Sequence, residues 1–284
     1  MKSLSILAGL TGLVAAAQTP QAILDNSAQV SRVPTSLESA VMGRRILALT
    51  KLATFSTVFP GSSSSAADQY DDAETLQKQP EGLGGVPVGL MDYIADCEDD
   101  GNPTVLAIKI GTSFRNVRAG SNLTISMRWI PTYPPSKRIS FLSRLSAYVP
   151  FLSGHCPYNT PPESRDSPDA VPYSAANLPR FSLFGYMEAI GGAQSALDQL
   201  SACYTRKHQD AKYWLPGNRI HESEWMRFVV TGVYWVGGFG DRAYIGWIPV
   251  EEWKSVTRDQ WGAITLPGEK KGWSEWSIDA SGEL

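Results

Sequence analysis

The succession of apolar and polar segments along the chain predicts a mainly β protein. Residues 53–59 are rich in β-branched and aromatic side chains and stop at Pro60, which is typical of a strand. Similar segments predict further strands at residues 86–94, 104–110, 122–129, 180–190, 227–235 and 243–248. Six or seven strands with few helices favour a closed or nearly closed barrel, because closure pairs the strand edges.

Helical patterns are few and lie around the strands. Thr35 and Glu38 form a capping-box pattern that opens a helix through about residue 48. An amphipathic helix is expected at 191–208, a short helical link before the strand at 122–129, and a short helix from Pro249. The buried faces of the two longer helices are expected to hold Met42, Ile46, Leu49, Ala193, Ala196, Leu197, Leu200 and Tyr204.

The first seventeen residues are typical of a cleavable signal peptide. Lys2 precedes an apolar run at 4–14, and a run of alanines ends at Ala17, a pattern that signal peptidase accepts. As a helix that run spans about 17 Å, against about 30 Å of bilayer hydrocarbon, so it forms no stable membrane anchor. The pattern predicts a secreted protein, or one carried to a vacuole or lysosome-like compartment through the secretory pathway.

The remaining chain is interpreted as one domain with an insertion. Residues 18–35 form a flexible leader and residues 36–255 form the barrel domain. Residues 131–177 are rich in proline and serine and too long for an ordinary connection, so they are read as a surface insertion within that domain. Residues 256–284 are expected to form a C-terminal tail.

Charge and cysteine content exclude some classes of function. A net charge of −3 gives no electrostatic footprint for binding nucleic acid. Cys97, Cys156 and Cys203 predict one disulfide and one free thiol in an oxidising compartment, with the pairing left open. Their wide spacing matches no zinc pattern, so no metal is assigned. Asn122 begins an Asn-Leu-Thr sequon and is a candidate glycosylation site.

Three stretches resemble a known superfamily. The helix-to-strand segment 44–57 and the segment 102–127 are similar to the opening and to the third strand, short helix and fourth strand of the flavin-binding split barrel of the pyridoxamine 5′-phosphate oxidase-like superfamily. Residues 235–240 resemble the C-terminal strand and turn of its haem-degrading and CREG-like branches. The signal peptide and the segment 208–216 point to the CREG-like branch, whose members are secreted or lysosomal glycoproteins.

The resemblance implies a homodimer and a candidate flavin site. Split barrels of this superfamily hold FMN at the subunit interface. Thr112, Ser113, Arg115 and Asn116 stand where flavin-binding relatives hold the FMN phosphate, and Arg118 adds a second cation. The alternative interpretation is that Thr112 or Ser113 caps the short helix, while the arginines lie in solvent or pair with carboxylates.

Other features of the sequence argue against bound flavin. The strand at 86–94 lacks the paired basic residues of the oxidases and carries Asp92, which would repel a phosphate. CREG proteins resemble the flavoproteins in fold yet lack flavin because side chains fill the pocket. Bulky residues that could do so here are Phe114, Trp129 and Tyr93, although aromatic residues in strands more often form core.

The sequence gives little support for haem chemistry or for a phosphate-binding loop. Haem ligation in the haem-degrading branch uses a histidine near the C-terminus, and this chain has none after His221. His208 and His221 are expected to be solvated or to cap helix ends, and His155 lies in the insertion. The glycines at 237–240 have no following phosphate-loop helix, so they favour a tight turn or close backbone approach at a dimer seam.

The sequence therefore predicts a secreted CREG-like split-barrel glycoprotein that acts as a non-catalytic binding or structural module, with an unidentified ligand or protein partner. The alternative hypothesis is an FMN-dependent oxidoreductase of the secretory pathway. An enzyme with bound FMN is the less favoured of the two.

Overall fold

The computed structural model describes residues 33–61, 82–133, 175–218, 221–240 and 243–273. The predicted signal peptide and nearly all of the leader lie outside the described residues. So do most of the proline- and serine-rich insertion, with His155 and Cys156, and the last eleven residues of the chain.

The structure confirms each of the predicted strands. Their bounds are β1 Leu52–Val58, β2 Pro87–Tyr93, β3 Thr104–Ile108, β4 Leu123–Arg128, β5 Arg180–Ala189, β6 Ser223–Val236 and β7 Ile245–Ile248. The helices are α2 Ser36–Leu49, α3 Thr112–Arg118, α5 Gln194–Lys207, α6 Val250–Ser255 and α7 Arg258–Gly262, with 3₁₀ turns η3 Ala175–Asn177 and η4 Gln209–Tyr213. Strand β6 begins four residues earlier than expected because its first part pairs with β3.

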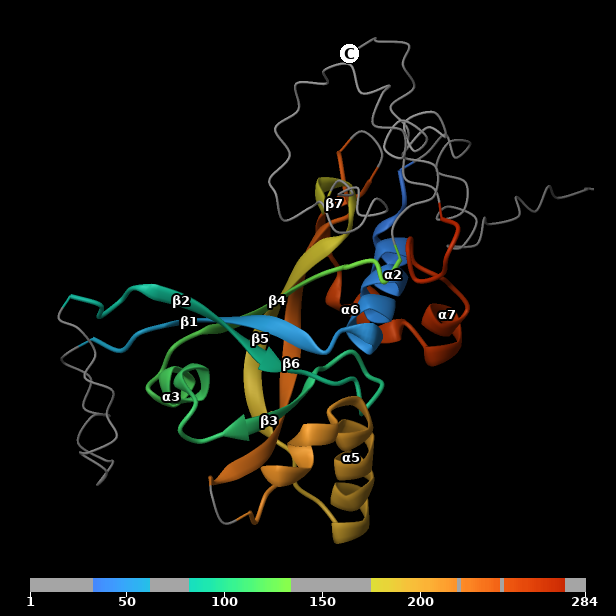
Figure 1. Cartoon of the computed structure of the whole chain (residues 1–284). Coiled ribbons are helices and arrows are strands. Elements are labelled where there is room, and N and C mark those ends of the chain that lie inside the picture. The colour runs from blue at the N-terminus through green and yellow to red at the C-terminus, as the bar shows by residue number, and fades with distance from the viewer. Residues whose placement is uncertain (1–32, 62–81, 134–174, 219–220, 241–242, 274–284) are drawn as a thin grey trace, which may run out of the picture.

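The strands form one antiparallel sheet in the order β2-β1-β4-β5-β6-β3, and β7 also pairs with β6. The first strand of this order, β2, and the last, β3, meet just beyond the end of β2. There, Ala95 and Thr104 exchange two backbone hydrogen bonds, of 3.0 and 2.7 Å. This bridge joins the end of β2 to the start of β3, so the sheet curls into a nearly closed barrel (Figure 1).

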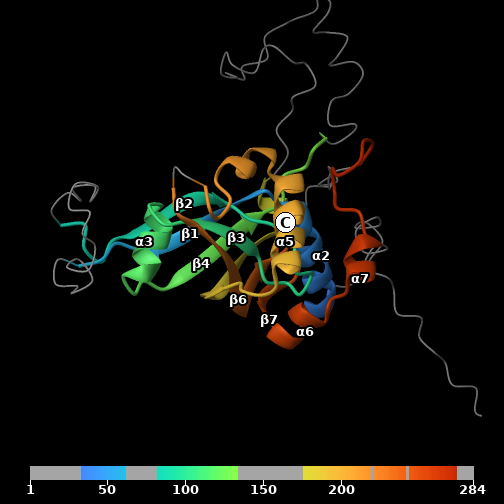
Figure 2. The ribbon, with the colours of Figure 1, turned by 90° about the horizontal axis from the view of Figure 1, so that it is seen from below.

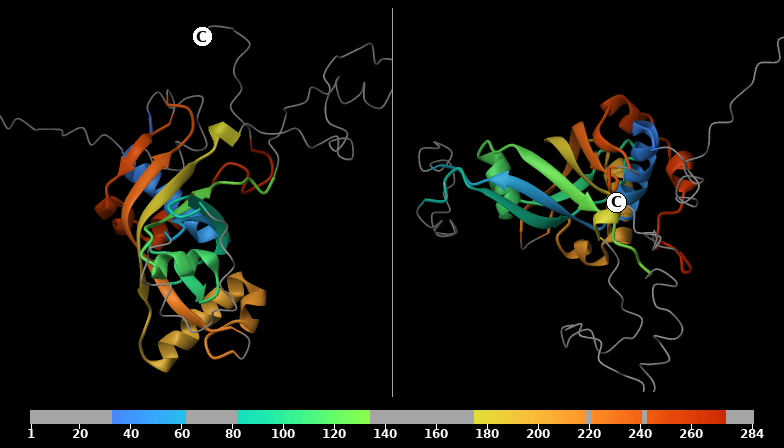
Figure 3. Two further views of the ribbon diagram at one scale, coloured as in Figure 1. Left: turned by 90° about the vertical axis from the view of Figure 1, so that its left-hand side faces the viewer. Right: turned by 90° about the horizontal axis from the view of Figure 1, so that it is seen from above.

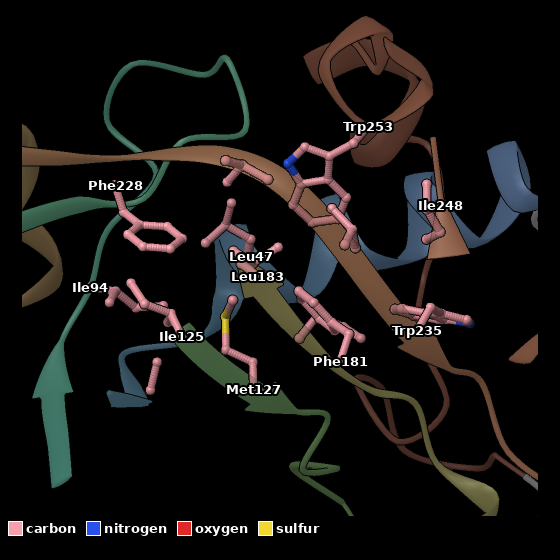
Figure 4. Close-up of a cluster of buried hydrophobic side chains, with 14 of the residues drawn as sticks. Leu47, Ile94, Ile125, Met127, Phe181, Leu183, Phe228, Trp235, Ile248 and Trp253 are labelled. Carbon is pink, nitrogen blue, oxygen red and sulfur yellow. The ribbon is translucent and has the colours of Figure 1, made fainter. Parts of the chain in front are cut away.

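A mixed aromatic and aliphatic core fills the inside of the curved sheet. Figure 4 shows side chains from α2, α6 and most of the strands meeting there. Phe181 of β5 lies between two tryptophans, with ring centroids 5.4 Å from Trp235 and 5.6 Å from Trp253. Alternate residues in β4 and β5 supply this core, as their periodicity predicts, whereas α2 supplies the adjacent residues 40–42 and 46–47.

The helices take different positions around the sheet. α2, α6 and α7 lie together on one side of the barrel, and α3 lies at the opposite end beside β1 and β4 (Figure 2). α5 lies below β3 in Figure 1, as Figure 3 also shows. The segment expected to be a C-terminal tail begins with α7, and it packs Val256, Ile264 and Leu266 into the core.

The predicted helix faces are only partly correct. The capping box of Thr35 and Glu38 is present, and Met42 and Ile46 are buried, but Leu49 is the last residue of α2 and is exposed. In α5 only Leu200 and Tyr204 are buried. Ala193 and Ala196 are exposed and Leu197 is half-buried, because only the second half of α5 packs against the barrel.

A fully buried arginine connects α2 to the C-terminal helices. The guanidinium of Arg44 donates hydrogen bonds to the backbone carbonyls of Trp253, Val256 and Asp99, at 3.2, 3.1 and 2.9 Å. A carboxylate oxygen of Asp96 lies 3.8 Å from the same group. The network fixes the loop after β2 between α2 and α6.

One disulfide is present within the described residues, as predicted. Cys97, in the loop after β2, is bonded to Cys203 of α5. The sequence had left this pairing open. The bond attaches α5 to the same loop after β2 that Arg44 binds. The disulfide and the hydrogen bonds of Arg44 therefore both fix this loop.

Candidate functional site

The four residues predicted to contact an FMN phosphate all lie on α3, which packs against β1. The N-cap of α3 is Gly111, and no side chain makes a cap hydrogen bond there. The interpretation in which Thr112 or Ser113 caps this helix is therefore wrong. Both residues lie inside the first turn of α3, and neither hydroxyl makes a cap hydrogen bond.

Ser113 faces inward and contacts an acidic side chain. It is 2% exposed, and its hydroxyl lies near the carboxylate of Asp92 on β2, where it lowers the pKa of that group. Burial raises the pKa of Asp92 above its ordinary value, and Ser113 only partly opposes that rise. Ser113 is thus buried next to an acidic side chain, where a phosphate would have to enter beside a carboxylate.

Asn116 is also used within the fold. Its side-chain amide donates a 3.0 Å hydrogen bond to the hydroxyl of Thr57 on β1, and both side chains are buried. This contact joins α3 to the barrel wall. A ligand could recruit Asn116 only by leaving Thr57 without its buried partner, which costs about 1–3 kcal/mol.

The other two candidates are only partly exposed, and the second cation is engaged. Thr112 and Arg115 are half-buried at the surface of α3. The guanidinium of Arg118 donates to the backbone carbonyl of Lys109. The structure therefore brings the four predicted residues together on one helix. Only the hydroxyl of Thr112 and the guanidinium of Arg115 remain accessible to a phosphate.

The bulky residues proposed to fill a flavin pocket belong to the core. Phe114 packs edge-on against Phe55, with ring centroids 6.0 Å apart, and Trp129 is 6% exposed. Tyr93 is half-buried and stacks on His208, at 4.3 Å between ring centroids. These aromatic side chains stabilise the barrel by close packing.

His208 is the C-cap residue of α5, as one of its two predicted roles requires, but it is not solvated. Its side chain is buried and its Nε2 lies 2.9 Å from the carbonyl oxygen of Ile94. Burial lowers the pKa of His208, which favours the neutral ring. His208 follows α5 directly, and it turns back toward the barrel between Tyr93 and Tyr204. His221 is exposed, as expected.

The glycine-rich turn after β6 is closely packed within the chain. At Gly237 a Cβ atom would lie 2.8 Å from the indole nitrogen of Trp235, so only glycine fits. The backbone N–H of Gly237 donates to the carbonyl of Tyr244 at 3.0 Å. This close approach explains the glycine without a phosphate ligand.

The outer face of the sheet carries an aromatic cluster that the sequence analysis missed. Phe184 of β5, Tyr234 of β6 and Trp247 of β7 have their rings in contact, with centroids 5.2 and 5.3 Å from that of Trp247. Trp247 is 58% exposed. The signal that could have found the cluster is that the outward positions of these strands are aromatic, where a solvated face would be polar.

Hydroxyl side chains lie beside this cluster in one row across the sheet. The hydroxyls of Ser126 and Ser182 are 2.8 Å apart and half-buried. The cross-strand register places the row as Met91, Thr54, Ser126, Ser182, Tyr234 and Trp247. Met91, at the far end, is 64% exposed. We call these six residues, together with Phe184, the outer-face row.

Two further features bear on function. Asn122 is exposed immediately before β4, so an attached glycan would extend from the surface. Among the described residues, no helix is long and apolar enough to cross a membrane. The same part of the chain holds no cluster of three or more His, Cys, Asp or Glu side chains suited to a metal ion.

A curled antiparallel sheet with α3 between its third and fourth strands and a helix at each end defines the split-barrel class of proteins. Residues 34–255 match the family model described as CREG, beta-barrel. The chain therefore belongs to the CREG β-barrel family, and the predicted fold class is confirmed. No curated protein sequence matches the chain.

Solved structures show a more distant likeness. A heme-binding protein from Mycobacterium smegmatis is 16% identical, with a TM-score of 0.46, over 79% of this chain and 62% of that one. HutZ, a heme storage protein from Vibrio cholerae, is 13% identical, with a TM-score of 0.37, over 72% and 96%. A FAD-binding protein from Mesorhizobium loti is 10% identical, with a TM-score of 0.37, over 72% and 95%.

Proposed function

We propose that this protein is a secreted CREG-family glycoprotein that works as a binding module without flavin and without catalysis. The observation that carries this proposal is the buried hydrogen bond from Asn116 to Thr57, which uses one of the four candidate phosphate contacts to hold α3 against the barrel. A second candidate, Ser113, is buried. A phosphate would also meet the negative charge of Asp92.

The location rests on three features of the chain. The signal-peptide pattern of residues 1–17 directs it into the secretory pathway. The disulfide between Cys97 and Cys203 persists in an oxidising compartment. Asn122, exposed before β4, accepts a glycan in that pathway.

The partner that fits the outer-face row is a second copy of this chain. The row is aromatic at one end, hydroxyl-bearing in the middle and apolar again at Met91, with 64% of that side chain exposed. Two copies related by a two-fold axis would place the aromatic end of each row toward the Met91 end of the other. An isologous contact of this kind is the commonest way in which soluble proteins form homodimers.

Replacing Trp247 with serine should weaken the dimer about 30-fold or more, because large aromatic side chains at interface centres contribute about 2 kcal/mol or more. Light scattering across a dilution series measures the change. The matched control is Tyr213→Ser, which removes an aromatic side chain that is 62% exposed on η4, away from the row. A dimer that dissociates equally in both variants, or in neither, contradicts the assignment of this face.

An FMN-dependent oxidoreductase is the second candidate function. It is favoured by Thr112 and Arg115, which stay partly exposed on the helix where flavin-binding relatives hold the phosphate. Under this alternative, Arg115→Ala would release the cofactor. Under the proposed function, the substitution leaves the spectrum and the fold unchanged.

A further inference from the structure

Two arginines lie directly opposite each other on neighbouring strands. Arg128 is the last residue of β4 and Arg180 is the first of β5, and the register pairs them across the sheet. Both side chains are exposed on the outer face. Like charges in direct cross-strand pairs destabilise a sheet, so this placement needs an explanation other than stability.

Neither arginine has an acidic partner within the described residues. Arg180 donates one long hydrogen bond, 3.4 Å, to the carbonyl of Ala176, and no contact satisfies Arg128. Elsewhere in the described chain, Arg44, Arg45 and Arg227 each pair with a carboxylate. The protein carries a net charge of −3, so carboxylates are not scarce. Two adjacent unpaired guanidinium groups are therefore an unusual concentration of positive charge.

A cavity lies between these two arginines. Its volume is about 230 Å³, and its other walls are formed by Trp129, Ala175 and Ala176. The indole N–H of Trp129 donates a 2.6 Å hydrogen bond to the carbonyl of Pro267, which holds the ring in place. Trp129 is only 6% exposed, so the space has two cationic groups and an apolar side formed mainly by Ala175 and Ala176.

Hydroxyl donors continue the same face. Ser126 and Ser182 lie two residues along β4 and β5 from Arg128 and Arg180, so all four side chains share one side of the sheet. The two serine hydroxyls are hydrogen-bonded to each other and do not line the cavity, so the donors available to an anion there are the two guanidinium groups.

We propose that the cavity between Arg128 and Arg180 binds the phosphate or sulfate group of a small ligand, whose apolar part lies against Ala175 and Ala176. Each guanidinium can donate two parallel hydrogen bonds to a tetrahedral oxyanion. The bound anion also removes the repulsion between the two cations. The site lies at the end of β4 and the start of β5, on different elements from Thr112 and Arg115 of α3, so it is separate from the candidate flavin site.

The test uses the full mature chain and titration calorimetry with sodium phosphate and sodium sulfate, at constant ionic strength. We expect saturable binding at one site per chain. Arg128→Gln and Arg180→Gln should each weaken phosphate binding about tenfold or more, since a lost charged hydrogen bond contributes about 1.5–3 kcal/mol. Arg206→Gln, which removes an exposed arginine on α5, should leave the affinity unchanged.

Phenyl phosphate tests the apolar side and distinguishes the two kinds of anion. It should bind more tightly than inorganic phosphate, because Ala175 and Ala176 give the site an apolar side. Its affinity should rise with pH through about 6, where a phosphate monoester takes its second charge, whereas phenyl sulfate should show no such change.

Three results would overturn the proposal. One is the absence of saturable binding of any of these anions. Another is an affinity for phosphate that falls as much in Arg206→Gln as in Arg128→Gln and Arg180→Gln, which would show that any positive charge on the surface attracts the anion. The third is that Arg115→Gln abolishes binding while Arg128→Gln binds as tightly as the natural protein, which would place the anion at α3. Because Arg128 and Arg180 lie on the same side of the sheet as the outer-face row, the titration is repeated with Trp247→Ser, and phosphate binding that persists in this variant separates the anion site from the dimer contact.

Discussion

Replacing Arg44 with alanine should lower the free energy of unfolding by about 3–5 kcal/mol, the usual cost of removing one partner of a buried charge network. The variant leaves three backbone carbonyls without their donor and Asp96 without its cation. Urea unfolding of the two proteins measures the difference. Arg206→Ala, at an exposed position of α5, is the control and should change stability little.

The loss in Arg44→Ala should also depend on pH. Burial already raises the pKa of Asp96 to about 6, although Arg44 opposes the rise. Without Arg44 the folded-state pKa moves further above the unfolded value. A group of this kind stabilises the fold at low pH and loses that contribution as pH rises. The deficit should therefore be larger at about pH 7.5 than at about pH 5, and equal deficits would contradict the role given to Asp96.

The second large effect is expected from the disulfide. The double variant Cys97→Ser/Cys203→Ser should lose about 2–5 kcal/mol of stability, because the bond closes a long loop in the unfolded chain. The two cysteines are 106 residues apart in sequence. Thermal unfolding with and without a reductant provides an internal control. The reductant should lower the midpoint of the natural protein to that of the variant and leave the variant unchanged.

A reductant that shifts both proteins equally would contradict this account. So would a variant as stable as the natural protein, since it would show that the loop after β2 is held by Arg44 alone. The comparison separates the covalent attachment of α5 from the hydrogen bonds that fix the same loop.

The barrel could be predicted from sequence because its determinants are local. The strands are short runs of β-branched and aromatic residues between turns, and the capping box of Thr35 and Glu38 marks the start of α2. Their periodicity identifies the elements whatever their partners are. The order of strands and the bridge between Ala95 and Thr104 depend on tertiary pairing, so the strand pattern predicted a nearly closed sheet but not which strands meet where it closes.

The details of the candidate site could not be predicted in the same way. Sequence placed Thr112, Ser113, Arg115 and Asn116 on one short helix correctly, but it gave no sign of which side chains turn inward. That depends on Thr57, which lies 59 residues before Asn116 in sequence. The burial of His208 was missed for the same reason, since its partner Ile94 belongs to another part of the chain.

The outer-face row and the arginine pair also come from long-range register. Tyr234 and Trp247 meet because β6 pairs with β7, and Arg128 faces Arg180 because β5 returns beside β4. Neither pair is visible as a motif in the linear sequence. A surface built from several strands becomes visible only when the register is known.

The most direct measurement of the central claim is a titration of the purified mature protein with FMN, followed by flavin fluorescence. Because Asn116 is held by Thr57 and Ser113 is buried near the carboxylate of Asp92, we predict a colourless protein that shows no saturable quenching of FMN. A yellow protein that releases one FMN per chain on unfolding, and loses it in Arg115→Ala, would contradict the account.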